Sequence, residues 1–273
     1  MTVLVHLSDL HMGTEVPAVV DALIDRVNSI HPDAVLVSGD LTQRARSKQF
    51  RAAKALLSRL EAPTHVVPGN HDIPLLNLLA RFFWPFRRYE REFLSSWVDA
   101  VQIDNIRILR VNSVRPERHA RGRVTSLQRR AARLMMSDVP ENHLILVLLH
   151  HPPVVKHAEA TVASLIDGDQ IMYEWCNARV DLVLSGHVHE QFLLPYRSVG
   201  KHVTWALNAG TATSSRLREG YPNSFNTIRI KTDETVTGSR RFDIERYDYR
   251  PDDNCFALAS NRQISADSLS KQQ

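Results

Sequence analysis

Side chains that bind metals or transfer protons recur at five points of the sequence, each directly after a short apolar run. In chain order they are Asp9, His11, Asp40, Asn70, His71, Asp72, His150, His187 and His189. Carboxylates, imidazoles and amides ligate divalent metals, and histidine also titrates near neutral pH. If these groups converge, the carboxylates need a cation to neutralise them. Two divalent metals could do so, because one carboxylate can bridge ions about 3.5–4 Å apart.

The densest of the five points is Gly69-Asn70-His71-Asp72, which follows an apolar run at 64–67 and Pro68. Proline cannot continue a central strand, so the motif is expected on a loop at a strand's carboxyl end. Glycine, asparagine and aspartate are also common turn residues, and alone the motif could be an ordinary strand-to-helix turn. The four other points favour a chemical role.

The N-terminal third must position the first three points. Its hydrophobic pattern predicts strands at 3–7, 34–37 and 64–67, with helices at 17–30 and 47–60 between them. This order indicates βαβ units on a largely parallel sheet, where site residues gather beyond the carboxyl ends of the strands. Asp9 and His11 lie two residues apart, so in an extended backbone they would point to the same side.

The rest of the chain is expected to mix strands and helices. Its predicted elements are a hairpin over 98–111 turning at Asp104-Asn105, a helix at 126–137 capped by Thr125 and Gln128, a strand at 144–149, a helix at 165–179 and a strand at 182–184. Runs at 190–196, 203–208, 225–231 and 235–246 read as antiparallel strands. We therefore expect one domain over 1–250 and a polar C-terminal tail over 251–273 that frays.

Two segments allow more than one interpretation. Residues 81–92 are dense in aromatics and arginine, which favours a helix with its rings on the core and its arginines in solvent. The alternative is a lid or lipid-facing flap over the site. Residues 115–133 hold seven arginines and one acid, Glu117, and are expected to form a solvated loop and helix face.

Composition is that of an ordinary globular protein: 273 residues, 43% hydrophobic and 23% charged, with a formal net charge of +4. Thirteen histidines against two cysteines make nitrogen and oxygen the expected metal ligands, and Cys176 and Cys255 are expected to be free thiols. The longest apolar run, 144–149, is too short to span a bilayer, and no targeting segment is visible. A cytoplasmic location is expected.

The ordered motifs Asp-x-His, Gly-Asp, Gly-Asn-His-Asp, His-His-Pro and Gly-His-x-His resemble those of the calcineurin-like metallophosphoesterases. The resemblance covers about residues 1–230. The Gly-His-Val-His ending is similar to the bacterial class III cyclic-nucleotide and glycerophosphodiester phosphodiesterases within that superfamily. The resemblance implies an α/β fold: a four-layer α/β/β/α sandwich with two mixed β-sheets.

The same resemblance implies the ligand sets. One metal would take Asp9, His11 and His189, the other Asn70, His150 and His187, and Asp40 would bridge them. The cofactors would be two divalent transition metal ions (Mn, Fe or Zn).

Further roles follow from the motifs. His71 would contact the substrate phosphoryl group or protonate the leaving oxygen, with Asp72 holding its orientation. His151 is expected to be structural or to support a ligand. Arg44 stands where related phosphatases carry a phosphate-binding arginine, although Gln43 and Ala45 depart from that motif. Residues 208–211 and Arg216 could line the rim of the site.

The implied activity is hydrolysis of a small anionic phosphodiester, such as a cyclic nucleotide, by attack of a metal-activated hydroxide. A nuclease, a lipid-linked pyrophosphatase and a phosphomonoesterase of the same superfamily are the alternatives. A non-catalytic scaffold is disfavoured, because none of the expected ligands is missing from the sequence. No stable nucleic-acid partner and no membrane span are expected, and a homodimer is compatible with the sequence.

Overall fold

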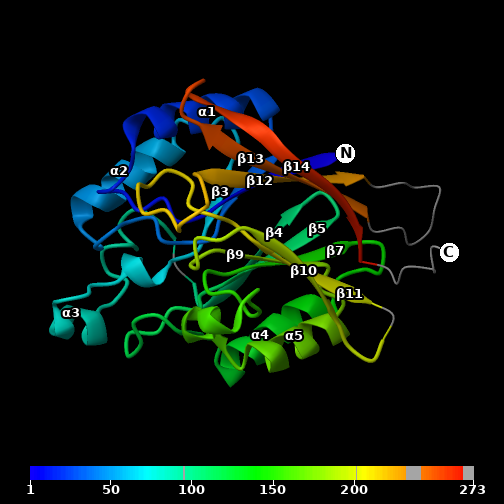
Figure 1. Cartoon of the computed structure of the whole chain (residues 1–273). Coiled ribbons are helices and arrows are strands. Elements are labelled where there is room, and N and C mark those ends of the chain that lie inside the picture. Colours follow the sequence, from blue (N-terminus) through cyan, green and yellow to red (C-terminus); the bar gives the residue numbers. More distant parts are fainter. Residues whose placement is uncertain (95, 201, 232–240, 267–273) are drawn as a thin grey trace.

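Two six-stranded β-sheets pack face to face in the computed structural model, which describes residues 1–94, 96–200, 202–231 and 241–266 (Figure 1). Helices α1 (Pro17–Ile30) and α2 (Ser47–Leu57) cover the outer face of the first sheet. Helices α4 (Ser126–Ser137) and α5 (Gly168–Asn177) cover the outer face of the second. The predicted α/β/β/α sandwich with two mixed sheets is confirmed.

The first sheet combines three parallel strands with three antiparallel ones. In spatial order its strands are β14 (Cys255–Ser265), β13 (Arg241–Arg250), β12 (Ser224–Lys231), β1 (Thr2–Leu7), β2 (Ala34–Val37) and β3 (Thr64–Val66). Strands β1, β2 and β3 run parallel and are joined through α1 and α2. The βαβ units predicted for the N-terminal third are therefore present, and their strands end at one edge.

The second sheet places parallel strands at its centre. In spatial order its strands are β10 (Phe192–Arg197), β11 (Val203–Asn208), β9 (Leu182–Ser185), β7 (Leu144–Leu148), β5 (Ile106–Val111) and β4 (Val98–Ile103). Strands β11, β9, β7 and β5 are parallel, and the two edge strands are antiparallel. Strand β11 has the antiparallel pairing expected of the runs after residue 190 with β10, but it pairs parallel with β9. The hairpin of β4 and β5 is confirmed.

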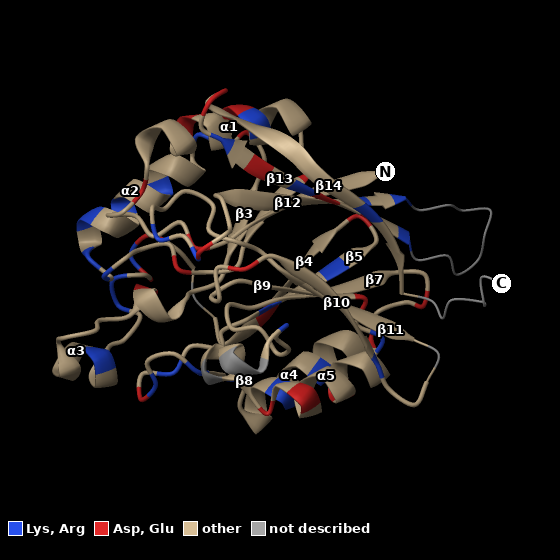
Figure 2. Ribbon diagram, viewed as in Figure 1, with Lys and Arg blue, Asp and Glu red and all other residues tan. Residues whose placement is uncertain are grey.

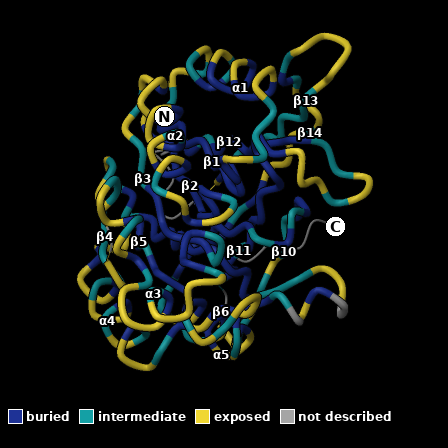
Figure 3. Tube along the Cα trace, turned by 90° about the vertical axis from the view of Figure 1, so that its left-hand side faces the viewer, coloured by how far each residue is buried: buried dark blue, intermediate teal, exposed yellow. Residues whose placement is uncertain are grey.

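The central strands are buried on both faces, since each sheet has the other sheet on one side and helices on the other. Leu4 and Leu36 of the first sheet pack with Leu146 and Leu184 of the second in one apolar cluster. The tube in Figure 3 shows these buried segments gathered in the interior. Burial on both faces explains why these strands read as continuous apolar runs rather than alternating ones.

Three segments show how the predicted helices and strands compare with the observed ones. Helix α4 begins after Thr125, whose hydroxyl accepts from the Gln128 N–H as the capping box predicted. The helix expected over 165–179 is shorter, because Leu165–Ile166 instead forms strand β8, which pairs with β6 (Gly122–Arg123). Of the run predicted at 235–246, residues 241–246 belong to β13, and residues 235–240 lie outside the described residues.

The expectation of a frayed tail beyond Arg250 is wrong for residues 255–265. They form β14, which pairs with β13 along its length. Phe256 and Ile264 are buried, and Phe256 packs on the Phe225 ring. An edge strand with one solvated face needs few apolar residues, which is why its sequence looks polar. Residues 267–273 lie outside the described residues.

The interpretation of residues 81–92 as a helix with buried rings and solvated arginines is wrong for its first part, although Phe86 and Tyr89 are buried and Arg87 and Arg91 are exposed. Helix α3 covers only Leu78–Phe83. Arg81 is 2% exposed, whereas Phe82, Phe83 and Trp84 are 57%, 68% and 60% exposed. Among the arginines of 115–133, Arg115 is likewise buried rather than solvated.

Candidate metal centre

The polar side chains singled out in the sequence meet where the carboxyl ends of five strands, drawn from both sheets, come together. Strands β1, β2 and β3 of the first sheet are followed by Asp9/His11, Asp40 and Asn70–Asp72 (η1). Strands β7 and β9 of the second sheet are followed by His150 and by His187/His189. The sequence predicted one sheet edge, but the structure forms the site across two.

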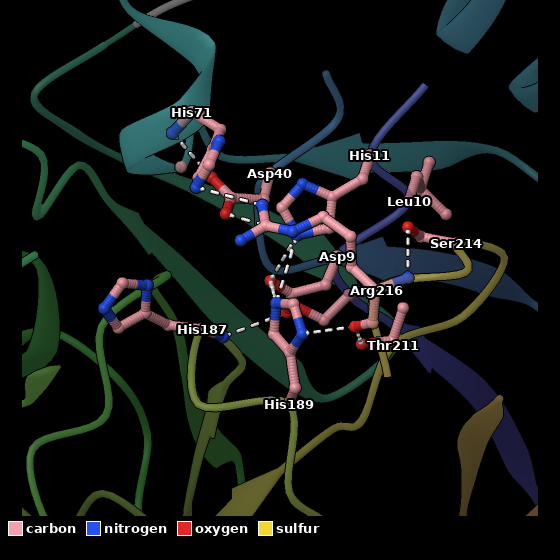
Figure 4. Close-up of polar contacts among 12 residues, drawn as sticks. Asp9, Leu10, His11, Asp40, His71, His187, His189, Thr211, Ser214 and Arg216 are labelled. Atoms are coloured by element: carbon pink, nitrogen blue, oxygen red, sulfur yellow. Dashed lines mark hydrogen bonds and ion pairs between the residues drawn. The ribbon is translucent and has the colours of Figure 1, made fainter. Parts of the chain in front are cut away.

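One group of donor atoms surrounds Asp9. Its Oδ1 atom lies 3.1 Å from His189 Nε2 and 3.4 Å from His11 Nε2, and the two Nε2 atoms are 3.1 Å apart. Figure 4 shows these three side chains pointing toward one another, Asp9 and His11 from the loop after β1 and His189 from the loop after β9. The first ligand set expected from the sequence is therefore brought together.

A second group of donor atoms surrounds His150. Its Nε2 atom lies 3.0 Å from Asn70 Oδ1 and 3.2 Å from His187 Nδ1. The amide nitrogen of Asn70 donates to the His119 carbonyl, which turns the amide oxygen toward the centre. This is the second expected set.

The carboxylate of Asp40 lies between the two groups. Its Oδ2 atom is 3.6 Å from His11 Nε2, and its Oδ1 atom is 3.4 Å from His150 Nε2. Each oxygen therefore faces one group. A carboxylate placed in this way can bridge two ions.

Backbone carbonyls fix the orientation of two of these imidazoles. The Nδ1 atom of His150 lies 2.7 Å from the Ser38 oxygen, and the Nδ1 atom of His189 lies 2.7 Å from the Arg216 oxygen. A carbonyl accepts only, so Nδ1 carries the proton and Nε2 presents a lone pair to the centre. This arrangement is typical of histidines that ligate metals.

These donor sets fit divalent metals. A metal bound at about 2.0–2.1 Å spaces neighbouring ligand atoms about 2.9–3.4 Å apart, close to the separations found here. Asp9 Oδ1, His11 Nδ1 and His187 Nε2 are buried and have no hydrogen-bond partner among the residues that the structure describes. Lone pairs of Asp9, His11 and His189 converge, which is unfavourable unless a cation lies among them.

The pKa shifts of Asp9 and His150 also indicate that the site favours positive charge. Burial opposes ionisation of Asp9, yet the charge of His189 holds the pKa of Asp9 well below its ordinary value. Burial also opposes the charge on His150, but Asp40 raises its pKa to about 9. The carboxylates thus favour protons on adjacent imidazoles, and a divalent metal would supply that charge instead.

The backbone at the centre is strained. Asp9, His11, Asp40, His187 and His189 all have positive φ, between 48° and 73°. A non-glycine residue in this region costs on the order of 1 kcal/mol or more and is typically found at functional sites. Asp9 and His11 therefore converge through a tight loop, and the extended backbone expected for them is absent.

Glycines in two of the motifs allow the loops of the two sheets to approach. A Cβ on Gly186 would overlap the side chains of Ser8 and Asp9, and a Cβ on Gly39 would press on the His150 ring. Gly39 also has a φ of +100°. The Gly-His and Gly-Asp motifs need glycine because atoms of the opposite sheet occupy the space of a side chain.

The prediction that Asp72 orients His71 is wrong. The buried carboxylate of Asp72 accepts from the backbone N–H groups of Leu41, Thr42 and Gly69 and from the Thr42 hydroxyl. Burial, followed by the charge of Asp40, raises the pKa of Asp72 to about 6. Asp72 therefore ties the loop after β2 to the loop after β3.

His71 is oriented by a residue that the sequence analysis did not single out for this role. Its Nδ1 atom lies 2.9 Å from the Gln43 carbonyl oxygen, so Nδ1 carries the proton. Its Nε2 atom lies 3.3 Å from Arg216 Nη1, which also donates to the Gln43 side chain. The His71 ring stands edge-on to His11, with ring centres 5.0 Å apart.

A cleft of about 600 Å³ opens over the centre. Its polar lining includes Arg44, His71 and Arg216, and Leu75 and Leu217 contribute apolar walls. Arg44 is exposed and reaches the cleft as expected, and Arg216 lies at the rim as expected. No signal in the sequence pointed to His119, which also lines the cleft.

Two further expectations concern residues behind the cleft. His151 is 1% exposed, and its Nδ1 atom lies 2.8 Å from the Ser113 hydroxyl. Its Nε2 atom has no hydrogen-bond partner. Asn208 is fully buried and donates to the Glu190 carbonyl. It supports the loop after β9 from beneath and does not line the rim as expected.

The chain belongs to the calcineurin-like phosphoesterase family, whose model matches residues 2–191. It is 24% identical over 196 residues to a probable cyclic nucleotide phosphodiesterase of Vesicomyosocius okutanii, which covers 68% of this chain and 78% of the relative. It is 25% identical over 244 residues to the 3',5'-cyclic-nucleotide phosphodiesterase alr5338 of Nostoc sp., covering 84% and 82%. A dimetal phosphatase from Danio rerio shares the fold, with a TM-score of 0.68 and 12% identity over 97% of this chain and 99% of that one.

Proposed function

We propose that this chain hydrolyses phosphodiester bonds of small anionic substrates with two divalent transition metals. The observation that supports this proposal most directly is the position of Asp40. One group of donor atoms faces its Oδ2 atom and the other group faces its Oδ1 atom. The proposed ligands are Asp9, His11 and His189 for one ion, Asn70, His150 and His187 for the other, and Asp40 as the bridge. The names of the two curated relatives support a diester substrate.

When bound, the two metals supply Lewis acidity to the phosphoryl group and to the attacking water. The remaining tasks belong to the chain. His71 presents Nε2 to the cleft, and in its imidazolium form, with both ring nitrogens protonated, it is proposed to contact the phosphoryl group or to give the Nε2 proton to the leaving oxygen. Arg216 holds that ring edge and adds positive charge beside it. The ring is held by Gln43 and Arg216, so little reorientation is needed during the reaction.

The cleft supports a small substrate. Its volume of about 600 Å³ lies within the usual range of about 300–1,000 Å³ for small-molecule sites. Its apolar walls, such as Leu75 and Leu217, suit a substituent of the diester, and the arginines suit its charge.

A phosphomonoesterase is the second candidate, because four arginines line the cleft where only Arg44 was expected from the family motif. The other three are Arg81, Arg216 and Arg218, of which Arg216 contacts His71. A monoester dianion needs more positive charge than a diester. The two candidates therefore differ in what they predict for substrate preference.

The test is a hydrolysis comparison on protein loaded in turn with Mn, Fe or Zn. Rates (kcat/KM) would be measured for bis(p-nitrophenyl) phosphate, p-nitrophenyl phosphate and 3',5'-cyclic nucleotides at one pH. We expect the diesters to be preferred and two metals to be bound per chain. A clear advantage for the monoester would favour the second candidate, and a protein that binds no metal would overturn both.

A further inference from the structure

A cluster of large apolar side chains lies in solvent on and beside helix α3. We call it the α3 surface, and its members, with their exposed fractions, are Leu76 (88%), Leu78 (60%), Leu79 (71%), Phe82 (57%), Phe83 (68%) and Trp84 (60%). Figure 1 shows α3 projecting from one end of the sandwich, clear of both sheets. Isolated exposed apolar residues are ordinary, but six within nine positions indicate a binding surface.

Contacts of the buried residues Arg81 and Tyr89 fix the conformation that exposes these apolar side chains. The Arg81 guanidinium donates to the carbonyl oxygens of Pro74, Pro116 and Arg118 at 2.6–2.9 Å. Tyr89 is fully buried and packs edge-on against Phe50 of α2. The segment thus buries the Arg81 guanidinium and exposes the rings from Phe82 to Trp84. Rotating these rings inward would break the three charge-assisted hydrogen bonds of Arg81.

Arginines surround the α3 surface. Arg87 and Arg91 follow it in the same segment and are exposed. The loop that accepts from Arg81 carries Arg118 and the exposed Arg121. Figure 2 shows further Lys and Arg on helix α2, against which Tyr89 of this segment packs. The nearby acids are fewer: Glu90 and Glu117 are exposed, and Glu92 lies 3.5 Å from Lys54, which offsets its charge. The apolar cluster is therefore bordered by positive charge.

We propose that the α3 surface inserts into the interface of an anionic lipid bilayer. Leucine, phenylalanine and tryptophan beside arginine form the composition that binds at the boundary of headgroups and acyl chains. A convex projection suits insertion, and its arginines complement anionic headgroups. A symmetric contact between two copies would place these same arginines opposite one another, which is unfavourable. The chain would lie on the bilayer: no described helix is long and apolar enough to cross one.

The position of the α3 surface relates it to the cleft. Leu75 and Arg81, which belong to the same segment, line the cleft wall. A chain bound through α3 would keep the cleft mouth near the headgroups, where phosphodiesters are abundant. This consequence for the substrate rests on the proposed function, whereas binding to the bilayer does not depend on it.

Vesicle sedimentation with the full chain tests the proposal. The probes are vesicles of phosphatidylcholine alone and vesicles with about 30% phosphatidylglycerol. We expect binding to the anionic vesicles that weakens with salt, and about tenfold or more weaker binding to the neutral ones. The variant Phe82→Ser/Phe83→Ser/Trp84→Ser should lose about tenfold or more in affinity for the anionic vesicles.

A matched control is available on α4, where Leu127 and Leu134 are 78% and 65% exposed. The variant Leu127→Ser/Leu134→Ser should bind anionic vesicles as wild type does. Circular dichroism and hydrolysis of a soluble diester should be unchanged in both variants, which separates loss of binding from loss of fold or activity.

Three results would overturn the proposal. The α3 variant could bind anionic vesicles as well as wild type, or wild type could bind neutral vesicles equally well. Alternatively, sedimentation equilibrium could show a wild-type dimer that the α3 variant loses while neither binds vesicles, which would assign the surface to a second copy of the chain.

Discussion

The two sheets contribute unlike halves of the candidate metal centre. The loops of the first sheet supply every oxygen donor, from Asp9, Asp40 and Asn70. The loops of the second sheet supply only imidazoles, from His150, His187 and His189. The carboxylates of the site are therefore confined to one side of the sheet boundary, and imidazoles, which carry no negative charge, face them from the other.

This difference indicates that a cation stabilises the site most when it lies between the loops of the two sheets. Carboxylates gathered on one sheet destabilise it unless positive charge lies beside them, and the imidazoles opposite supply ligands without adding negative charge. Ions bound between the halves would bind to both sheets at once. A hydrogen bond already connects the loops of the two sheets, because the backbone N–H of His187 donates to Asp9 Oδ2 at 2.9 Å.

The largest expected effect is the loss of the carboxylate shared by the two halves. Asp40→Ala should lower the metal content below two ions per chain, and kcat/KM for a diester should fall by more than about 10⁴-fold, beyond the loss of a single acid or base. Elemental analysis and kinetics give both readouts. Asp99→Ala, which removes a carboxylate paired with Arg110 far from the cleft, is the control. Two ions at full occupancy in Asp40→Ala would disprove the bridge.

The second largest effect is expected at His71, on the loop after β3 of the first sheet, where turnover can be separated from metal binding. His71→Ala should keep both metals and lose on the order of 10²–10⁴ in rate, as expected for a missing acid or phosphoryl contact. The control is His65→Ala, which removes a half-buried imidazole of β3, the strand that precedes His71, outside the cleft. Loss of metal in His71→Ala would make His71 a ligand and change the assignment of the first half.

A smaller effect is expected at Arg216, which lies between β11 of the second sheet and β12 of the first. Arg216→Gln should raise KM for a diester about tenfold, because a charged hydrogen-bond donor contributes about 1.5–3 kcal/mol. The metal content should not change. Arg197→Gln on edge strand β10 serves as the control for loss of one surface charge. An unchanged KM would leave Arg216 without a part in substrate binding.

The smallest effect on rate is expected at Asp72, whose contacts stay within the first sheet's loops. Asp72→Ala should lower the free energy of unfolding by about 1–3 kcal/mol, because it leaves buried N–H groups unsatisfied. Denaturant titration measures this loss. Thr42→Ser keeps the hydroxyl partner and should be nearly neutral. If stability were unchanged while the rate fell as in His71→Ala, Asp72 would act through His71 after all.

The sequence predicted the N-terminal βαβ units better than the strands that follow residue 190. The helix at 17–30 and the strand at 34–37 have the predicted bounds, because βαβ units are local and their periodicity is regular. Strand β11 pairs antiparallel with β10 as expected, but its parallel pairing with β9 was not predicted, because that partner is set by the sheet and not by local pattern. Strand β14 was missed, because an edge strand buries only one face.

The sequence by itself determined which donor types are present and that each follows a strand. It also placed the family motifs in order, since local hydrophobic runs and glycines leave few alternatives for such loops. It could not determine that Gln43, rather than Asp72, holds His71, or that Arg216 lies beside it. Nor could it predict that Arg81 is buried while Phe82 and its neighbours are exposed. These outcomes depend on contacts between residues brought together only when the two sheets pack, so only the tertiary structure could decide them.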